Sequence, residues 1–237
     1  MDDARTVFRI SGGDARSFLQ NLVTNNVDGI ETGLVWTALL TPQGKYLADF
    51  FLASDGDAVL LDVATSFAAG LHQRLGMYKL RADVSIAATE VVPSRGTGPV
   101  PSGAFADPRH DSMGWRAYDG RPGDDADWLK LRVAAGIPET GIELVANESY
   151  PLEMAFETLN GVDFRKGCYV GQEVTARMHH KTELRKGLKQ VAVTGTAPLG
   201  TEIINADGRP VGKLYSQADG LGLAYLRFDK ATDIMHA

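Results

Sequence analysis

The sequence predicts an α+β protein with a small all-β unit at its C-terminal end. Two segments, 11–23 and 66–80, carry apolar residues at helical spacing, whereas residues 34–64 hold β-prone apolar runs joined by tight turns. Beyond Lys189 the chain becomes a series of alternating strands punctuated by glycine, which ends near Arg227. Helices mixed with antiparallel strands are typical of the α+β class, and the C-terminal series favours a compact β-barrel.

The first two elements are a short strand and a helix. Residues 6–10, TVFRI, read as the strand. The helix follows within 11–23, where Asp14 is the expected N-cap. Its apolar residues share one face at helical spacing: Ala15, Phe18, Leu19 and Leu22.

A three-stranded meander is expected next. The stretches 34–40 and 45–53 are β-prone and apolar, and Pro42-Gln43-Gly44 joins them as a tight hairpin connection. Asp55-Gly56-Asp57 supplies a second turn before the strand AVLLDVA, 58–64.

The middle of the chain alternates between regular and irregular structure. Residues 66–80 predict a helix, and 82–91 return to a strand. Five of the ten prolines fall between Pro93 and Pro122, so residues 93–127 predict loops and short strands. A second helix is expected at 124–135, and a short helix is expected within 148–161.

Composition limits the function classes. A net charge of −6 and a pI near 5.4 argue against general affinity for nucleic-acid phosphates, which calls for a basic surface. One cysteine excludes an internal disulfide and a self-contained zinc or iron–sulfur site of the multi-cysteine kind. No apolar run approaches the roughly 20 residues that cross a bilayer, and the first residues lack a secretory pattern. We therefore expect a cytoplasmic protein without a membrane or nucleic-acid partner.

The twelve residues 166–177, KGCYVGQEVTAR, hold the single cysteine, Cys168, two residues from Lys166. An ammonium stabilises a nearby thiolate, so Lys166 is a candidate to activate Cys168. Gly167 and Gly171 permit positive φ and close approach of the backbone to a ligand. The alternative is an inert, buried thiol in a tight turn.

This segment resembles the signature of the YgfZ family, the folate-binding relatives of the glycine-cleavage aminomethyltransferase that act in iron–sulfur cluster assembly. Residues 8–52 and 184–227 also resemble the two ends of this GcvT-like fold, whereas 93–128 match it poorly. The resemblance implies a discontinuous α/β module around a central channel, over residues 1–187, capped by a small barrel over 188–237. A tetrahydrofolate species is expected in the channel, with Cys168 at its rim.

Candidate folate contacts follow from the same resemblance: Asp49, Tyr169, Gln172, Glu173 and Arg177. In the resembled fold, an acid at or next to Asp49 faces the reactive side of the folate; the alternative is an acid exposed to water. Gln172 and Glu173 are expected either to share the polar recognition or only to orient the cysteine loop. Arg177 stands four residues after Glu173, so a helix would favour an ion pair between them.

One departure from the aminomethyltransferase pattern is informative. Residues 131–136, LRVAAG, resemble its LRLEAG segment, in which the glutamate reads the pterin ring. Ala134 stands at that position and offers no acceptor, which argues against aminomethyl transfer. The neighbouring Arg132 favours an ion pair at the edge of the core over direct contact with a ligand.

The remaining polar residues give weaker signals. His179 and His180 are adjacent, so their side chains point apart, and no second His/Cys cluster completes a metal site. No metal is therefore expected. The cations Lys166, Lys181, Arg185 and Lys186 are either a solvated face or a platform for the anionic folate tail.

The favoured function is a folate-binding accessory protein for iron–sulfur enzymes, with a reactive Cys168. Its expected partners are a reduced folate and iron–sulfur enzymes or cluster-assembly proteins. The residues leave open whether the protein is an enzyme. Two alternatives remain: a folate-dependent aminomethyltransferase of glycine cleavage, and a non-catalytic interaction domain in which the signature only shapes a turn.

Overall fold

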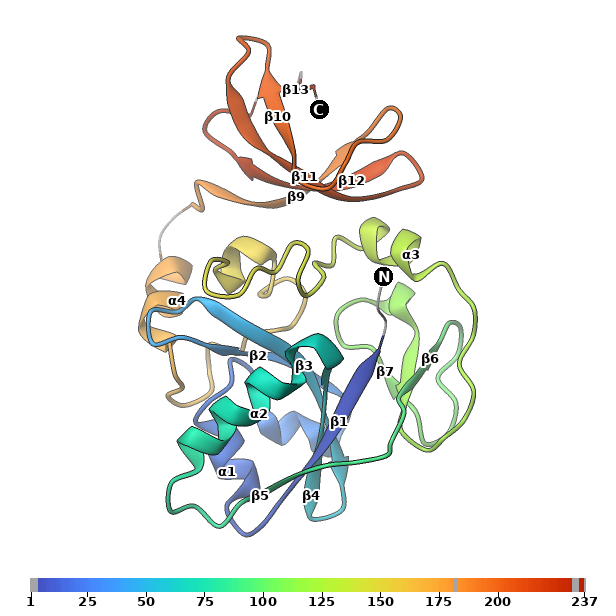
Figure 1. Cartoon of the computed structure of the whole chain (residues 1–237), viewed down its shortest axis with the longest axis vertical. Coiled ribbons are helices and arrows are strands. Elements are labelled where there is room, and N and C mark those ends of the chain that lie inside the picture. Colours follow the sequence, from blue (N-terminus) through green and yellow to red (C-terminus); the bar gives the residue numbers. More distant parts are fainter. Residues whose placement is uncertain (1–3, 181–182, 232–234, 237) are drawn as a thin grey trace.

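The computed structural model describes residues 4–180, 183–231 and 235–236. The chain forms an N-terminal α+β part and a C-terminal β-sheet that lies over one end of it (Figure 1). The two parts contain different sheets, and every named strand pair is antiparallel. This arrangement confirms the predicted α+β class.

A five-stranded sheet in the order β2-β3-β4-β1-β5 forms the centre of the N-terminal part. Its strands are β1 (Arg5–Ser11), β2 (Val35–Leu40), β3 (Tyr46–Asp55), β4 (Ala58–Ala64) and β5 (Ser85–Ala88). The predicted hairpin and meander are confirmed, because β2 pairs with β3 and β3 pairs with β4. The strand β1 then pairs with β4 and β5, which brings the start of the chain into the sheet.

Both faces of this sheet are covered, so β2 is buried along its whole length and β3 is buried from Tyr46 to Ala53. Successive side chains of a strand point to opposite faces: Phe50 belongs to one core and Phe51 to the other. The helices α1 (Ala15–Gln20) and α2 (Thr65–Lys79) cover the Phe50 face (Figure 1).

The N-terminal end of α1 differs from the expectation in one respect. Asp14 does occupy the N-cap position, but its side chain makes no cap hydrogen bond. Instead its carboxylate accepts a hydrogen bond from the backbone N–H of Asp83 at 2.8 Å. Asp14 therefore ties the start of α1 to the segment before β5.

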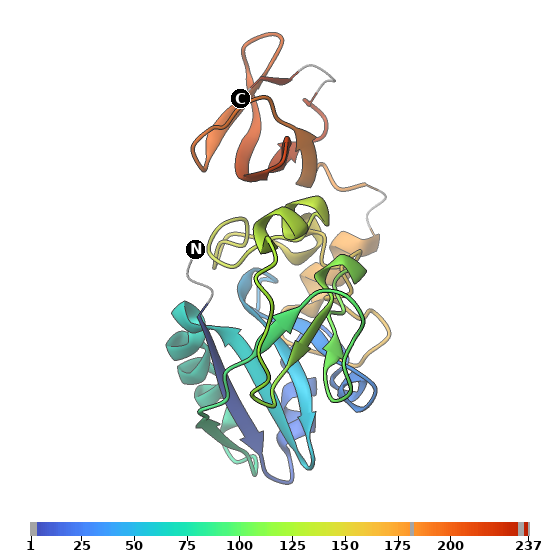
Figure 2. The same ribbon diagram turned by 90° about the vertical axis from the view of Figure 1, so that its right-hand side faces the viewer.

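The Phe51 face is covered by irregular segments and short elements. Three short strands form a small sheet in the order β6-β8-β7: β6 (Ser94–Gly96), β7 (Phe105–Ala106) and β8 (Trp115–Ala117). This sheet is drawn in green at the front of Figure 2. The 3-10 helices η1 (Val27–Glu31), η2 (Asp111–Met113) and η3 (Pro151–Met154) and the helices α3 (Trp128–Ala134) and α4 (Gln172–His180) complete the N-terminal part. The predicted loops and short strands of 93–127 are confirmed.

Two predicted helices are shorter than expected. The helix predicted at 124–135 begins at Trp128, because Asp124 instead accepts hydrogen bonds from the backbone and hydroxyl of Thr97. The helix predicted within 148–161 is only η3, since Ala155 adopts a left-handed conformation with φ 61° and ends it.

The C-terminal sheet has the order β13-β10-β11-β12-β9. Its strands are β9 (Lys186–Ala192), β10 (Thr201–Asn205), β11 (Pro210–Ala218), β12 (Leu221–Arg227) and β13 (Met235–His236). Within the described residues no pairing joins β13 to β9, so the sheet is strongly curved in Figure 1 but not closed. Its small core is made of Ile203, Val211, Leu214, Ala224 and Leu226.

Buried polar contacts attach this sheet to the N-terminal part. The Arg132 guanidinium donates to Ser216 Oγ at 2.5 Å, and the Glu143 carboxylate accepts from the Ser216 backbone N–H at 3.1 Å. Tyr225 donates to Glu153 at 2.5 Å.

Among the helices in the described ranges, none is long and apolar enough to cross a membrane.

Candidate functional site

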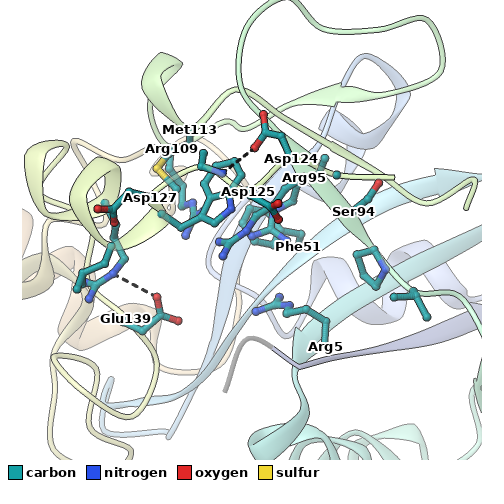
Figure 3. Close-up of a pocket in the computed structure, with 18 of the residues that line it drawn as sticks. Arg5, Phe51, Ser94, Arg95, Arg109, Met113, Asp124, Asp125, Asp127 and Glu139 are labelled. Atoms are coloured by element: carbon teal, nitrogen blue, oxygen red, sulfur yellow. Dashed lines mark hydrogen bonds and ion pairs between the residues drawn. The ribbon is translucent and has the colours of Figure 1, made fainter. Parts of the chain in front are cut away.

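A cavity of about 890 Å³ lies against the Phe51 face of the central sheet (Figure 3). Its walls come from β1, β3, the segment 92–95, the residues around η2 and β8, the loop 120–129 and residues 138–140. This volume falls within the usual range for small-molecule sites. The lining is rich in charged side chains of both signs, which makes it the candidate ligand site.

Three arginines surround one aromatic ring in this cavity. The Cζ atoms of Arg116, Arg109 and Arg5 lie 4.1, 4.8 and 5.7 Å from the centre of the Phe51 ring. Guanidinium groups at such distances are attracted by the electrons of the ring face. Figure 3 shows Arg5, Arg109 and Phe51 within the same wall.

Two buried carboxylates, Asp62 and Asp107, hold these arginines in place. Asp62 accepts from Arg5 Nε at 2.6 Å and from Arg116 Nη1 at 3.3 Å. Asp107 accepts two hydrogen bonds from Arg109, at 2.9 and 2.7 Å. Burial alone would lower the pKa of Arg109, but the charge and hydrogen bonds of Asp107, together with the charges of Glu139 and Asp49, outweigh it and the pKa is raised. The wall is therefore a fixed array of charged arginines.

Arg116 keeps one buried donor without a hydrogen-bond partner among the described residues, its Nε–H. Asp107 Oδ2 lies 3.7 Å from this nitrogen, which is an ion-pair distance but too long for a hydrogen bond. A buried donor without an acceptor costs about 1–3 kcal/mol. The Nε atom has almost no accessible surface, so it belongs to the buried side of the wall and is not presented to a ligand in the cavity.

Asp49 is buried and lines the cavity, so the alternative of an acid exposed to water is wrong. It lies two residues before Phe51 in β3 and therefore faces the same side of the sheet. Its carboxylate accepts from Trp36 Nε1 at 2.9 Å, from Tyr46 OH at 2.7 Å and from the Thr140 hydroxyl. Burial and this nearby charge raise the pKa of Tyr46, which keeps its proton on the bond to Asp49.

Glu139 is a second acid in the cavity wall, and the sequence analysis did not identify it. Its Oε2 lies 3.3 Å from Arg132 Nε, and the carboxylate is about one-third exposed. Burial raises the pKa of Glu139; the Arg132 charge opposes this shift and the Asp49 charge adds to it. A single glutamate after a proline gives no sequence signal, because only the fold brings it to Asp49.

The ion-pair interpretation of Arg132 is confirmed. Its guanidinium is buried and donates to the Ile137 carbonyl at 2.8 Å and to Glu143 at 3.1 Å. Ala134 is exposed and is not part of the cavity lining. The position that corresponds to the pterin-reading glutamate therefore does not face this cavity.

Lys166 lies in a different environment from the one predicted. Its ammonium donates three hydrogen bonds to backbone carbonyls, those of Gln20 at 2.8 Å, Val23 at 2.5 Å and Asn25 at 2.9 Å. All three N–H donors are used, so none is left for the Cys168 thiolate. Burial lowers the pKa of Lys166 to about 8. The structure assigns Lys166 to fixing the chain that follows α1.

Cys168 is exposed, so the alternative of a buried thiol is wrong. It is not among the residues that line the cavity, and the expected position at the rim is not observed for this cavity. Tyr169, the next residue, is buried in the core beside Trp36, Tyr46 and Phe156. The cavity and the cysteine are thus two separate features.

The other signature residues also lie outside the cavity lining. Gln172 opens α4, and Glu173 and Arg177 are exposed on it. The segment is helical as the ion-pair expectation required, but no hydrogen bond or ion pair between Glu173 and Arg177 is found among the described residues. Of the seven predicted site residues, only Asp49 faces the cavity.

The described histidines and part of the basic stretch have partners within the fold. His179 stacks on Phe164 with ring centres 3.8 Å apart and pairs with Glu157 at 3.2 Å. In the described ranges no group of three or more His, Cys, Asp or Glu residues is arranged to hold a metal ion. Of the predicted tail platform, Lys186 pairs with Glu153 at 3.7 Å, and Lys181 lies outside the described residues.

Comparison with solved structures shows the fold. Aminomethyltransferase T of the glycine cleavage system from Bartonella henselae superposes with a TM-score of 0.70 at 12% identity, covering 95% of this chain and 76% of that chain. The sequence model of the CAF17 C-terminal beta-barrel domain matches residues 185–237. The expected GcvT-like fold with a C-terminal barrel is therefore confirmed, whereas a domain boundary at residue 187 stays a prediction.

Comparison with curated sequences shows the family. The mitochondrial iron–sulfur cluster assembly factor IBA57 of Mus musculus is 31% identical over 281 residues, covering 99% of this chain and 78% of that protein. The human protein of the same name is 31% identical over 279 residues, with the same coverage. The expected YgfZ family is a bacterial relative of this group, so the expectation was close but named a different branch. This chain belongs to the family of the iron–sulfur cluster assembly factor IBA57.

Proposed function

We propose that this protein supports the assembly or repair of iron–sulfur enzymes and binds a reduced folate in the arginine-walled cavity. The assembly role rests on family membership and extends to this chain the activity that the relatives' names state. Its partners would be cluster-assembly proteins or the iron–sulfur enzymes themselves. A cytoplasmic location remains a prediction, since the relatives are named as mitochondrial proteins.

The observation that carries the folate proposal is that three charged arginines and the two carboxylates Asp49 and Glu139 line one cavity. A reduced folate has a ring with N–H donors, a ring carbonyl and a carboxylate tail. Glu139 would accept hydrogen bonds from the ring, Asp49 would place a negative charge close to it, and the arginine wall would attract a carbonyl or carboxylate oxygen. The residues present therefore fit the ligand, and the cavity has the volume of a small-molecule site.

A bound reduced folate would supply a carrier for one-carbon units. The protein contributes orientation and charge: the arginine wall fixes the acceptor end of the ligand, and the buried Asp49 offers a negative charge close to the ring. Cys168 lies on a separate, exposed loop, where it is accessible to a partner protein rather than to the cavity.

Two measurements test the two halves of this proposal. Calorimetric titration with tetrahydrofolate should show binding, and a complete absence of binding heat would contradict the folate half of the proposal. Expression in a strain defective in iron–sulfur enzyme maturation should restore the activity of an enzyme that requires a [4Fe–4S] cluster. No restoration by the wild-type chain would contradict the assembly half.

Cys168→Ala tests whether the thiol takes part, and Gly167→Ala is its matched control. Gly167 is exposed, and an added Cβ there meets no atom within 4 Å. We expect Cys168→Ala to fold normally but to lose complementation, while Gly167→Ala complements fully. Full complementation by Cys168→Ala would show that the thiol is dispensable.

A further inference from the structure

Glu139 presents an unpaired carboxylate oxygen to the cavity. Its Oε2 lies 3.3 Å from Arg132 Nε, while no group among the described residues donates a hydrogen bond to Oε1. In Figure 3 the Glu139 carboxylate and the Arg5 guanidinium point into the space between them. A partly buried carboxylate with a free oxygen is a strong acceptor for N–H donors of a ligand.

The backbone around Glu139 is held rigidly. Its N–H donates to Glu143 Oε2 at 2.9 Å, and its carbonyl accepts from the N–H groups of Ile142 and Leu144 at 3.1 and 3.0 Å. The hydroxyl of the next residue, Thr140, donates to Asp49. A group fixed in this way is preorganised, so little entropy is lost when a ligand binds.

Position 134 cannot take this role in this fold. Ala134 ends α3 with its side chain exposed and outside the cavity lining, and its carbonyl accepts from Gln190 at 2.8 Å. Glu139 follows five residues later and does line the cavity. An acid at position 134 would therefore lie outside this cavity, whereas Glu139 lines it.

We propose that Glu139 is the residue that selects the ligand, by accepting hydrogen bonds from adjacent N–H donors of a planar heterocycle, such as the 2-amino and ring N–H groups of a reduced pterin. This inference rests on the proposed folate function. The carboxylate sets which ring edge enters, while the charged arginine wall attracts an acceptor elsewhere on the same ligand. A ring that lacks the 2-amino group loses one of the paired bonds and leaves the carboxylate oxygen unpaired.

The test compares 5-formyltetrahydrofolate with its 2-desamino analogue by calorimetry on the full chain. Wild type should bind the 2-amino compound about 10- to 100-fold more tightly, the effect of one charge-assisted hydrogen bond. Glu139→Gln should lose a similar factor for the 2-amino compound and should no longer discriminate. Thermal melting should show Glu139→Gln folded, because Arg132 keeps Glu143, the Ile137 carbonyl and Ser216 as partners.

Two control variants make the result specific. Glu148→Gln removes an exposed carboxylate outside the cavity lining, and Ala134→Glu restores an acid at the aligned position. Both should bind like wild type. Equal affinity of wild type for the two compounds, or discrimination retained by Glu139→Gln, would overturn the inference and leave the folate proposal standing. Wild type that binds neither compound would overturn both.

Discussion

Replacing Lys166 by methionine removes an ammonium that joins the signature segment to the chain after α1, while keeping a side chain of similar length over the Tyr169 ring. Three carbonyls, at 2.8, 2.5 and 2.9 Å, lose their donor. At about 1 kcal/mol for each net hydrogen bond, the free energy of unfolding should fall by about 3 kcal/mol. For a chain of this size such a loss lowers the Tm by about 6–12 °C.

Urea unfolding followed by circular dichroism measures this loss, with Arg165→Met as the matched control. Arg165 is the preceding residue, and its side chain is 96% exposed. Its substitution should change the free energy of unfolding by no more than about 0.5 kcal/mol. A Lys166→Met variant within 1 kcal/mol of wild type would refute the structural role assigned to these three bonds.

Three further predictions concern the same region. Gly171→Ala should destabilise the fold by about 2 kcal/mol or more, because its φ is +83° and the added Cβ would lie 2.5 Å from the Thr41 carbonyl oxygen. Thermal melting measures this loss, and Gly167→Ala should be nearly neutral in the same experiment. Native Cys168 should react with iodoacetamide at a rate within a few-fold of the rate in the unfolded chain. Lys166→Met should not slow this reaction, because the Lys166 ammonium donates its hydrogen bonds to backbone carbonyls. A tenfold lower rate in Lys166→Met would show that Lys166 does activate the thiol. Burial lowers the pKa of Lys166 to about 8, so as the pH rises the native state releases this proton before the unfolded chain does. The stability of wild type relative to Lys166→Met should therefore rise between about pH 8 and the ordinary lysine pKa of 10.5. A fall in relative stability over that range would contradict the lowered pKa.

The sheet was predictable because its signals are local. Tight turns at 42–44 and 55–57 separate apolar runs, and these runs pair as expected. Asp49 is flanked in β3 by apolar residues on both sides, a pattern typical of a strand covered on both faces, and this pattern favours a buried Asp49. The shortened helix at η3 was not predictable in this way, since the left-handed conformation of Ala155 depends on tertiary packing.

The cavity was not predictable because its residues are distant in sequence. Arg5, Phe51, Arg109 and Glu139 come from separate segments, and no local spacing connects them. Lys166 shows the converse problem: it is two residues from Cys168 in sequence, but its ammonium points to the carbonyls after α1. Their proximity along the chain suggested that Lys166 activates Cys168, whereas in the fold Lys166 holds three backbone carbonyls in place.

Arg132 connects the cavity wall to the C-terminal sheet. Its guanidinium donates to Ser216 in β11 and also pairs with Glu139. Any displacement of the C-terminal sheet therefore pulls on the group that orients this carboxylate. If a protein that docks on the sheet changes the affinity of the cavity through this contact, thermodynamic reciprocity requires that an occupied cavity changes the docking affinity by the same factor.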